Sequence, residues 1–307
     1  MTPIHSTRAL AKLDGSRYNR LVPDRPQRPP RAEPREIQEL RQLKAAQPEL
    51  ASAVDMQIDL LDAQRRVQAR VPLPWMRPDA AWLTSQQAAG RAVVRFADIP
   101  IDWTDFRLSL RQTADILHRY EVIDREEHRQ VLKLAHDGDG LPALVAAWYN
   151  ATSGAADTAS APARPAVPNL NHVLALAIRP FLSRSAEALV QGVDLSGWHF
   201  GHCPFCGWEP DFATITSSGD RRLICGRCAA QWTFGAYTCP FCANDDRQQI
   251  TSFATRDGQY RVYACDACKR YLKAYDSRSA SRPVLVGVDA IATLPLDAAA
   301  IQRGYSG

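Results

Sequence analysis

The eight cysteines of this 307-residue chain lie between Cys203 and Cys268 and form four Cys-x-x-Cys pairs. The pairs read CPFCG from position 203, CGRCA from 225, CPFCA from 239 and CDACK from 265. A Cys-x-x-Cys turn places two sulfur atoms on one side of a tight loop, and two such loops complete a tetrahedron of thiolates. The pattern therefore predicts metal binding, and both zinc and iron accept four thiolate ligands.

The spacing of the pairs indicates which of them share a metal. Residues 207–224 separate the first two pairs and residues 243–264 the last two, close to the spacing of ribbon-type sites, and each interval holds a hairpin signal. The alternative is a cross-braced arrangement, first pair with third and second with fourth. We expect sequential pairing, in which site 1 is Cys203, Cys206, Cys225 and Cys228, and site 2 is Cys239, Cys242, Cys265 and Cys268.

Two rival uses of these cysteines stay open beside a structural one. CPFC resembles the redox-active Cys-Pro-aromatic-Cys motif, in which the first cysteine begins a helix, but the flanks here are strand-like. A zinc ribbon that binds nucleic acid would present a basic face, whereas residues 200–276 contain nine Lys and Arg against eight Asp and Glu. Because the charges nearly balance, we expect no nucleic-acid partner. Saturated four-cysteine sites are usually structural, so we favour metals that stabilise the fold.

The remaining side chains that could take part in catalysis or metal binding do not form a catalytic set. His199 and His202 adjoin the first pair, and we expect them to stay outside the ligand sets because four sulfurs already fill each tetrahedron. The sequence shows no Ser-His-Asp arrangement, paired carboxylates or Gly-rich phosphate loop. It therefore predicts a protein that is not an enzyme.

Aromatic residues near the cysteines allow a weaker hypothesis about partner binding. Trp232 and Phe234 lie on one face of an expected strand, and Tyr271 and Lys273 follow the last pair. Core packing is the simplest explanation of such residues. If they are exposed instead, they would form a surface for a protein partner.

Residue patterns and composition predict an α+β, multidomain protein. Apolar residues at helical spacing predict helices from 37 to 70, with a second helix beginning at Pro48, and over 104–120, 124–136, 142–150 and 169–191. Short runs at 213–216, 221–225, 230–238, 250–255 and 260–265 predict strands. The expected parts are a disordered Pro/Arg-rich tail (1–36), a helical domain (37–197) with a flexible insertion (151–168), metal modules at 198–236 and 237–276, and a C-terminal segment packing back (277–307).

Charge and hydropathy restrict the setting. The net charge of +4 comes from residues 1–36, which hold eight Lys and Arg against four Asp and Glu, so the rest of the chain offers no excess charge for a polyanion. No run of about 18 apolar residues occurs, and the first residues carry charges where a signal peptide needs an apolar core. We expect a cytoplasmic protein without membrane insertion.

The C-terminal third resembles the FdhE family of formate dehydrogenase accessory proteins. The segments that carry this resemblance are CPFCG with WEPDFATI, RRLICGRCAAQW, CPFCAND, SFATRDGQYRVYACDACKRYLKAYD and VDAIATLPLDAAAIQRGYS, within residues 198–305. Ala243 is a departure, because Gly often follows such a pair.

The resemblance implies a helical domain followed by two tandem rubredoxin-like modules that hold iron on the eight cysteines, with zinc as the alternative. It also implies a cytoplasmic assembly factor that binds the catalytic subunit of respiratory formate dehydrogenase before its export. A redox-active metal protein that exchanges electrons or thiols during maturation is the alternative, and a nucleic-acid-binding ribbon ranks below it.

Overall fold

The computed structural model describes residues 33–153, 167–280 and 282–307. Almost all of the expected Pro/Arg-rich tail (1–36), and most of the expected insertion (151–168), lie outside these residues, so both remain predictions. Arg35–Gly307 forms one unit of the chain, distinct from Met1–Pro34.

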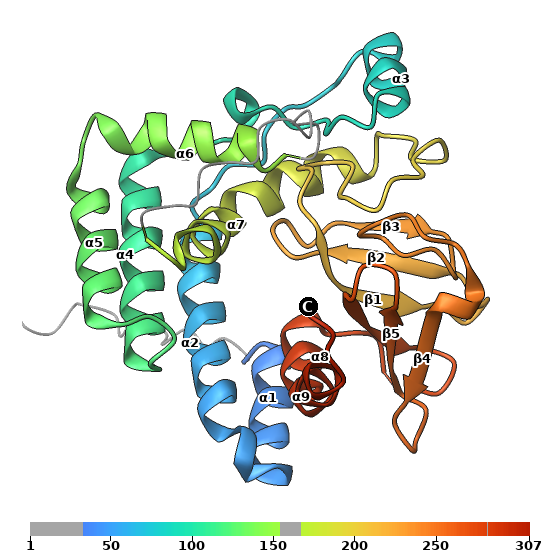
Figure 1. The fold of residues 1–307 in the computed structure, drawn as a ribbon. Helices are drawn as coiled ribbons and strands as arrows, with labels where there is room; N and C mark the ends of the chain where they lie inside the picture. Colours follow the sequence, from blue (N-terminus) through green and yellow to red (C-terminus); the bar gives the residue numbers. More distant parts are fainter. Residues whose placement is uncertain (1–32, 154–166, 281) are drawn as a thin grey trace, which may run out of the picture. The chain divides into compact units, whose positions relative to one another are not determined.

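The N-terminal part of this unit is helical (Figure 1). Its elements are α1 (Arg35–Ala46), the 3-10 turn η2 (Pro48–Leu50), α2 (Ala51–Gln68), α3 (Ala80–Ala88), the 3-10 turn η3 (Phe96–Asp98), α4 (Trp103–Arg119), α5 (Arg125–His136), α6 (Gly140–Ala151) and α7 (Leu170–Val190). The helices expected from periodicity are present within a few residues of their predicted ends. Helix α3 was not predicted, because none of its residues is buried and no apolar stripe marks it.

Side chains at the helix starts explain several boundaries. Asp102 accepts a hydrogen bond from the Asp105 backbone N–H at 2.9 Å and caps α4. Asp124 and Glu127 form a capping box at α5, since each side chain accepts from the other's backbone N–H. Glu127 also accepts from the Asn169 amide at 2.9 Å, so the cap of α5 fixes the start of α7.

A six-stranded sheet follows the helices. Its strands are β1 (Pro210–Ile215), β2 (Arg221–Cys225), β3 (Gln231–Phe234), β4 (Ile250–Ala254), β5 (Tyr260–Cys265) and β6 (Tyr271–Asp276). The spatial order is β3-β2-β1-β6-β5-β4. All neighbours are antiparallel except β1 and β6, which pair in parallel from Ala213 opposite Ala274 to Ile215 opposite Asp276.

The parallel β1–β6 pair joins two ribbons, β1-β2-β3 and β4-β5-β6, into one sheet. The prediction of two tandem four-cysteine modules after a helical region is confirmed, and the structure adds that they share this sheet. Strand β6 was not predicted. All six of its residues are buried, so it lacks the alternation of polar and apolar residues that marks a half-exposed strand.

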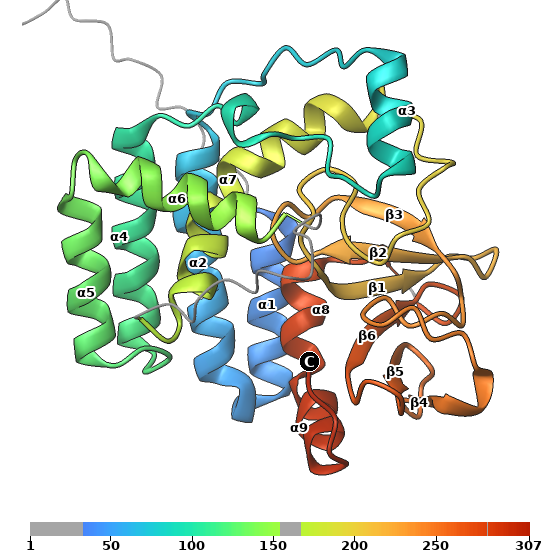
Figure 2. The ribbon, with the colours of Figure 1, turned by 45° about the horizontal axis from the view of Figure 1, so that its top comes forward.

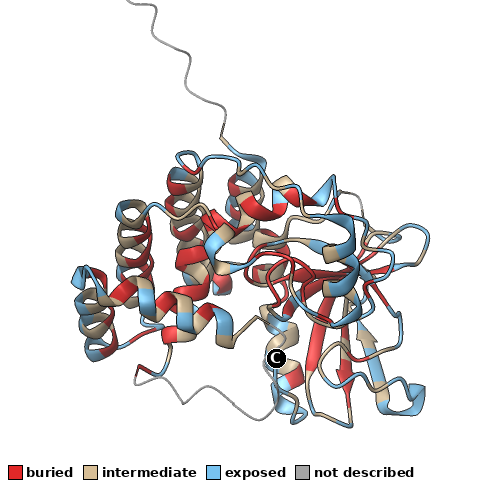
Figure 3. Ribbon diagram, turned by 90° about the horizontal axis from the view of Figure 1, so that it is seen from above, coloured by how far each residue is buried: buried red, intermediate tan, exposed pale blue. Residues whose placement is uncertain are grey.

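The buried residues follow the facing sides of the helices and the inner strands (Figure 3). The largest apolar cluster runs from α4 through α7 into the first ribbon, and it includes the four cysteines of site 1. The first metal module therefore shares its core with the helical region, whereas no site 2 cysteine belongs to this cluster.

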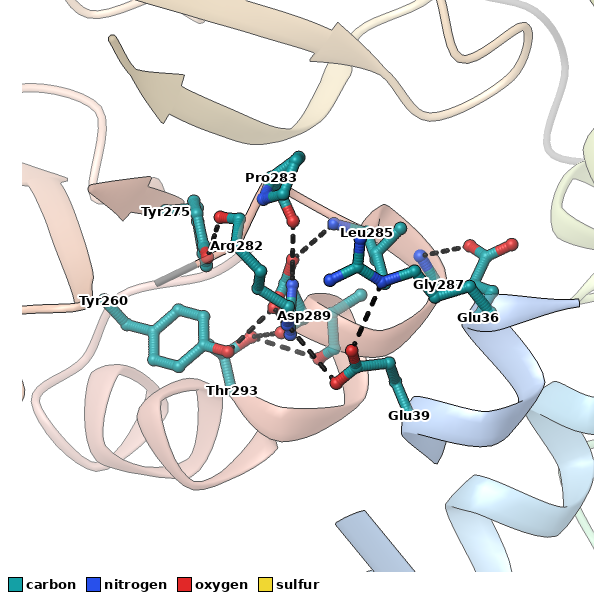
Figure 4. A network of polar contacts seen from close by, with 12 residues as sticks. Glu36, Glu39, Tyr260, Tyr275, Arg282, Pro283, Leu285, Gly287, Asp289 and Thr293 are labelled. Atoms are coloured by element: carbon teal, nitrogen blue, oxygen red, sulfur yellow. Dashed lines mark hydrogen bonds and ion pairs between the residues drawn. The ribbon is translucent and has the colours of Figure 1, made fainter. Parts of the chain in front are cut away.

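The C-terminal helices α8 (Val286–Ala292) and α9 (Leu294–Gln302) return to the start of the unit, where α8 lies beside α1 (Figures 1 and 2). Leu40, Val54 and Val288 form an apolar cluster between α1, α2 and α8. Polar contacts around the buried Asp289 then connect α8 to α1 and to strand β5 (Figure 4).

Candidate metal centres

Site 1 collects the first two cysteine pairs. The Sγ atoms of Cys203 and Cys228 lie 3.6 Å apart, and those of Cys206 and Cys225 lie 3.4 Å apart. All four Sγ atoms lie within 4.8 Å of one another, and all four residues are buried. The arrangement is sequential rather than cross-braced.

Site 2 repeats this arrangement with the last two pairs. Its Sγ separations are 3.7 Å between Cys239 and Cys268 and 3.7 Å between Cys242 and Cys265. Again all four Sγ atoms lie within 4.8 Å of one another. Among the described residues, these two sets are the groups of Cys, His, Asp and Glu side chains placed closely enough to share a metal ion.

The sulfur geometry fits a tetrahedral ion. With metal–sulfur bonds of about 2.3 Å, the sulfurs of a regular tetrahedron lie about 3.8 Å apart. The separations of 3.4 to 3.7 Å, for two sulfur pairs in each site, are close to this value. All eight cysteines are free thiols, so no disulfide competes for the sulfurs. The two sites can hold two metal ions, and we propose the eight cysteines as the ligands.

Four equivalent turns build the two sites. In each, the residue after the second cysteine donates its backbone N–H to the carbonyl of the first cysteine, at 2.8 to 3.1 Å. That residue has a positive φ in every turn, and the four are Gly207, Ala229, Ala243 and Lys269. Ala243, the departure noted in the sequence, adopts φ +59° and closes its turn at 3.0 Å. The third turn is therefore as tight as the others.

Burial and neighbouring groups shift the pKa values of the site 1 thiols in different directions. Burial raises the pKa of the Cys203 thiol. Burial acts in the same direction on Cys206, but hydrogen bonds from the other three thiols and the nearby Arg227 lower the Cys206 pKa well below its ordinary value. Of these two thiols, Cys206 therefore loses its proton more readily.

Site 2 has the same asymmetry. Burial raises the pKa of Cys239 to about 12. Burial would also raise the Cys265 pKa, but the backbone N–H groups of Cys268 and Ala267 lower it to about 7. Metal binding at this site must therefore release protons from its thiols.

Arg227 connects site 1 to the helical region. This arginine is fully buried, and it donates to the Cys206 carbonyl and, at 3.0 and 3.2 Å, to the hydroxyls of Thr152 and Ser153 after α6. Its guanidinium also lies 4.5 Å from the centre of the Tyr149 ring. Arg227 was not among the residues predicted from the sequence. The sequence did contain a signal for its role. Arg227 lies between the two cysteines of the CGRCA pair, where its positive charge can balance the negative charge of thiolates.

Helix α7 and the segment before η3 also contact site 1. Arg179 donates to the Gly226 carbonyl at 2.8 Å, within the second turn. The backbone N–H groups of Val93 and Val94 donate to the carbonyls of Pro204 and Phe205, within the first turn, at 2.9 and 2.8 Å. The helical region thus reaches both turns that hold site 1.

Neither histidine beside the first pair faces a metal centre. His202 donates from Nε2 to the Gly90 carbonyl at 2.8 Å, and burial lowers its pKa. The exposed His199 pairs through Nδ1 with the Gly197 carbonyl at 3.1 Å. Neither ring is among the groups that lie closely enough together to share a metal ion.

The four residues considered for partner binding are buried. Trp232 is 3% exposed, Phe234 8%, Tyr271 7% and Lys273 8%. Lys273 donates to Asp297 of α9 at 2.6 Å, and Tyr271 donates to the same carboxylate at 2.7 Å. The hypothesis of an exposed partner surface at these positions is therefore wrong in this structure. The first two pack in the core, and α9 covers the other two.

Comparison with known proteins finds similar sequences and a similar fold but no matching family model. Two curated proteins named "Protein FdhE homolog" are similar: that of Stutzerimonas stutzeri is 29% identical over 108 residues, and that of Haemophilus influenzae (strain PittGG) is 33% identical over 75 residues. These matches cover 34% and 24% of this chain, and they span only 35% and 25% of the relatives' own lengths.

The fold is similar to the crystal structure of the FdhE protein from Pseudomonas aeruginosa. The TM-score is 0.55 at 19% sequence identity, and the match covers 88% of this chain and 91% of that one. Together with the sequence matches, this likeness confirms the resemblance to the FdhE family. Within the described ranges, no helix has both the length and the apolar character needed to cross a bilayer.

Proposed function

We propose that this chain, which resembles the FdhE family in sequence and in fold, is a formate dehydrogenase accessory protein. In this role it binds the catalytic subunit of respiratory formate dehydrogenase in the cytoplasm, before that subunit is exported, and supports assembly of active enzyme. The proposed factor is not itself an enzyme.

One observation supports the proposal most directly. Two four-cysteine sites with tetrahedral sulfur spacing lie on a fold that is similar to FdhE over most of its length. Each site can use all four ligand positions of its ion for protein sulfurs, which leaves no open position for a substrate. Such metals stabilise a binding protein rather than catalyse a reaction.

The metal is proposed to be iron, as the resemblance implies, with zinc as the alternative. Both ions accept tetrahedral thiolate coordination, and the sulfur separations suit either. When bound, the metals hold the four turns together and so stabilise both ribbons of the sheet. Metal analysis of the purified chain, with the visible absorption of ferric thiolate as a second readout, distinguishes the two ions.

The test is co-purification. The tagged full chain is expressed together with a formate dehydrogenase catalytic subunit from the same organism, and complexes are isolated in metal-loaded and metal-free form. We expect the subunit to be retained by the loaded chain. Failure to retain it in either metal state would reject the proposed function.

A second candidate, a redox-active metal protein, is favoured by one observation. Cys242 of site 2 is exposed, so electrons or thiols could reach that site. If this candidate is correct, an iron-loaded chain bleaches on reduction and recovers its colour on reoxidation. A chain that holds only zinc and has no reactive thiol would reject it.

A further inference from the structure

The two metal sites have the same backbone construction, so their differences come from their surroundings. The opening cysteine of each turn donates its backbone N–H to the carbonyl five residues later, at 2.8 to 2.9 Å in all four turns. The paired sequences align position by position, as CPFCG with CPFCA and CGRCA with CDACK. This internal repeat makes each residue of site 1 comparable with its counterpart in site 2.

Exposure separates the sites. The cysteines of site 1 are between 0% and 3% exposed. In site 2, Cys239 and Cys265 are buried, but Cys268 is partly exposed and Cys242 is exposed. Solvent therefore reaches two cysteine residues of site 2, whereas all four cysteine residues of site 1 are buried.

The residues inside the first turn of each site explain this difference in exposure. Pro204 and Phe205 of site 1 are buried beneath the segment that contains Val93 and Val94, which donates hydrogen bonds to both carbonyls. Their counterparts, Pro240 and Phe241, are only partly buried. The helical region thus covers the first turn of site 1 but not that of site 2.

The second turns differ at one informative position. Arg227, between the third and fourth cysteines of site 1, is fully buried and reaches Thr152 and Ser153 beyond α6. Its counterpart in site 2 is Ala267, which is exposed. Gly207 adds a second contact, because a Cβ atom there would clash with the backbone of Ser153. Site 1 is therefore closed by the two residues that follow α6, on a side where site 2 is open.

We propose that site 2 is the exchangeable site, which takes up and releases a thiophilic metal ion through Cys242, and that site 1 is a closed structural site. This inference deepens the proposed function by assigning different roles to the two metals. Both sites offer the same four-thiolate ligand set, and we assign the difference between them to access.

The exchange step conserves charge and oxidation state. If site 2 holds a metal ion, a donor atom of an incoming thiolate or chelator would bind that ion as the bond to the Cys242 sulfur breaks, and Cys242 would leave as a thiolate. At site 1 an incoming ligand cannot reach the buried cysteines until the contacts between Arg227 and the residues after α6 break.

The experiment measures metal release from the full chain loaded with two equivalents of Zn²⁺, using pyridylazoresorcinol as the coloured chelator. We expect one equivalent to be released at least about tenfold faster than the other, which corresponds to a barrier difference of about 1.4 kcal/mol. Limiting iodoacetamide followed by mass spectrometry provides a second readout, and Cys242 should be modified first among the eight cysteines.

Variants assign the two phases. Cys242→Ser should abolish the fast phase and keep the slow one. Arg227→Ala should accelerate the slow phase, because it removes the contacts to Thr152 and Ser153. Arg222→Ala is the matched control, since Arg222 lies on β2 but is exposed, and it should change neither phase.

Three results would overturn the proposal: equal release of both equivalents, loss of the slow phase in Cys242→Ser, or preferential alkylation of a site 1 cysteine. If Cys242→Ser does not fold, the alkylation order in the unmodified chain still decides. No formate dehydrogenase is present in these assays, so their failure is distinct from failure of the co-purification test.

Discussion

The Arg282 guanidinium and the Asp289 carboxylate form a two-bonded ion pair, at 2.8 and 3.2 Å, in which the carboxylate is completely buried (Figure 4). The same carboxylate accepts from the Tyr260 hydroxyl of β5 at 2.8 Å, and Arg282 also approaches Glu39 of α1 at 3.5 Å. One buried acid on α8 therefore connects the second metal module to the first helix of the unit.

Replacing this acid should destabilise the whole unit. Asp289→Asn removes the nearer of the two carboxylates beside the mostly buried Arg282 and leaves only Glu39 at 3.5 Å, so we expect a loss of about 3 kcal/mol in the free energy of unfolding. Asp59→Asn is the control, because Asp59 pairs with an exposed Arg119 and should cost less than about 1 kcal/mol. Urea unfolding of the metal-loaded chains measures both. Equal losses in the two variants would contradict the role of Asp289.

A second buried arginine should behave differently. Arg221 of β2 is 2% exposed, burial lowers its pKa to about 10, and its Nε and Nη2 atoms have no hydrogen-bond partner among the described residues. Nη1 donates to the carbonyl of Thr238 at 3.0 Å, just before site 2. Thr238 is only partly buried, so water can replace this bond.

Arg221→Met should therefore cost less than about 1 kcal/mol, because it keeps most of the volume and removes a poorly compensated buried charge. Arg221→Ala should cost about 2 to 4 kcal/mol through the cavity it creates. Thermal unfolding of the two variants at equal metal loading makes the comparison. A methionine variant as unstable as the alanine variant would show that the charge itself is required.

Metal affinity at site 2 should depend on pH in a defined way. Thiols must lose their protons to bind metal, so affinity rises with pH. Since the pKa of Cys265 is about 7 and that of Cys239 about 12, the metal-free site gains one further proton as the pH falls through 7. Below about pH 7, affinity should therefore fall by about one extra factor of ten per pH unit. Competition titrations in the Cys206→Ser background, at pH 6 to 8, measure this slope, and an unchanged slope across pH 7 would contradict it.

The metal centres were more predictable from the sequence than their surroundings. Cys-x-x-Cys turns are local structures whose spacing fixes the ligand sets, and the sequential pairing followed from the two hairpin signals. The periodic helices were also predictable, because burial of one face leaves an apolar stripe. Strand β6 was missed for the opposite reason, since a strand buried on both faces shows no alternation.

The contacts that distinguish site 1 from site 2 were not predictable. Thr152 and Ser153 precede Arg227 by 75 and 74 residues along the chain, and no local pattern links them to it. The same limit explains the wrong hypothesis for Tyr271 and Lys273. Only the tertiary structure shows that α9 covers them through Asp297.

Gly207 provides a direct test of the contact between site 1 and the helical region. Its φ of +73° is matched by positive φ values at Ala229, Ala243 and Lys269 in the other turns, so conformation alone does not require glycine there. The backbone of Ser153 occupies the space that a Cβ would need.

Gly207→Ala should therefore destabilise the unit by more than the roughly 1 to 2 kcal/mol expected for a left-handed alanine. Gly219→Ala is the matched control, because Gly219 has φ +90° and a Cβ added there would meet nothing within 4 Å. Urea unfolding compares their stabilities, and hydrogen exchange at the end of α6 reports the local contact. Faster exchange is expected in Gly207→Ala alone. Similar exchange in both variants would mean that α6 does not depend on its approach to Gly207.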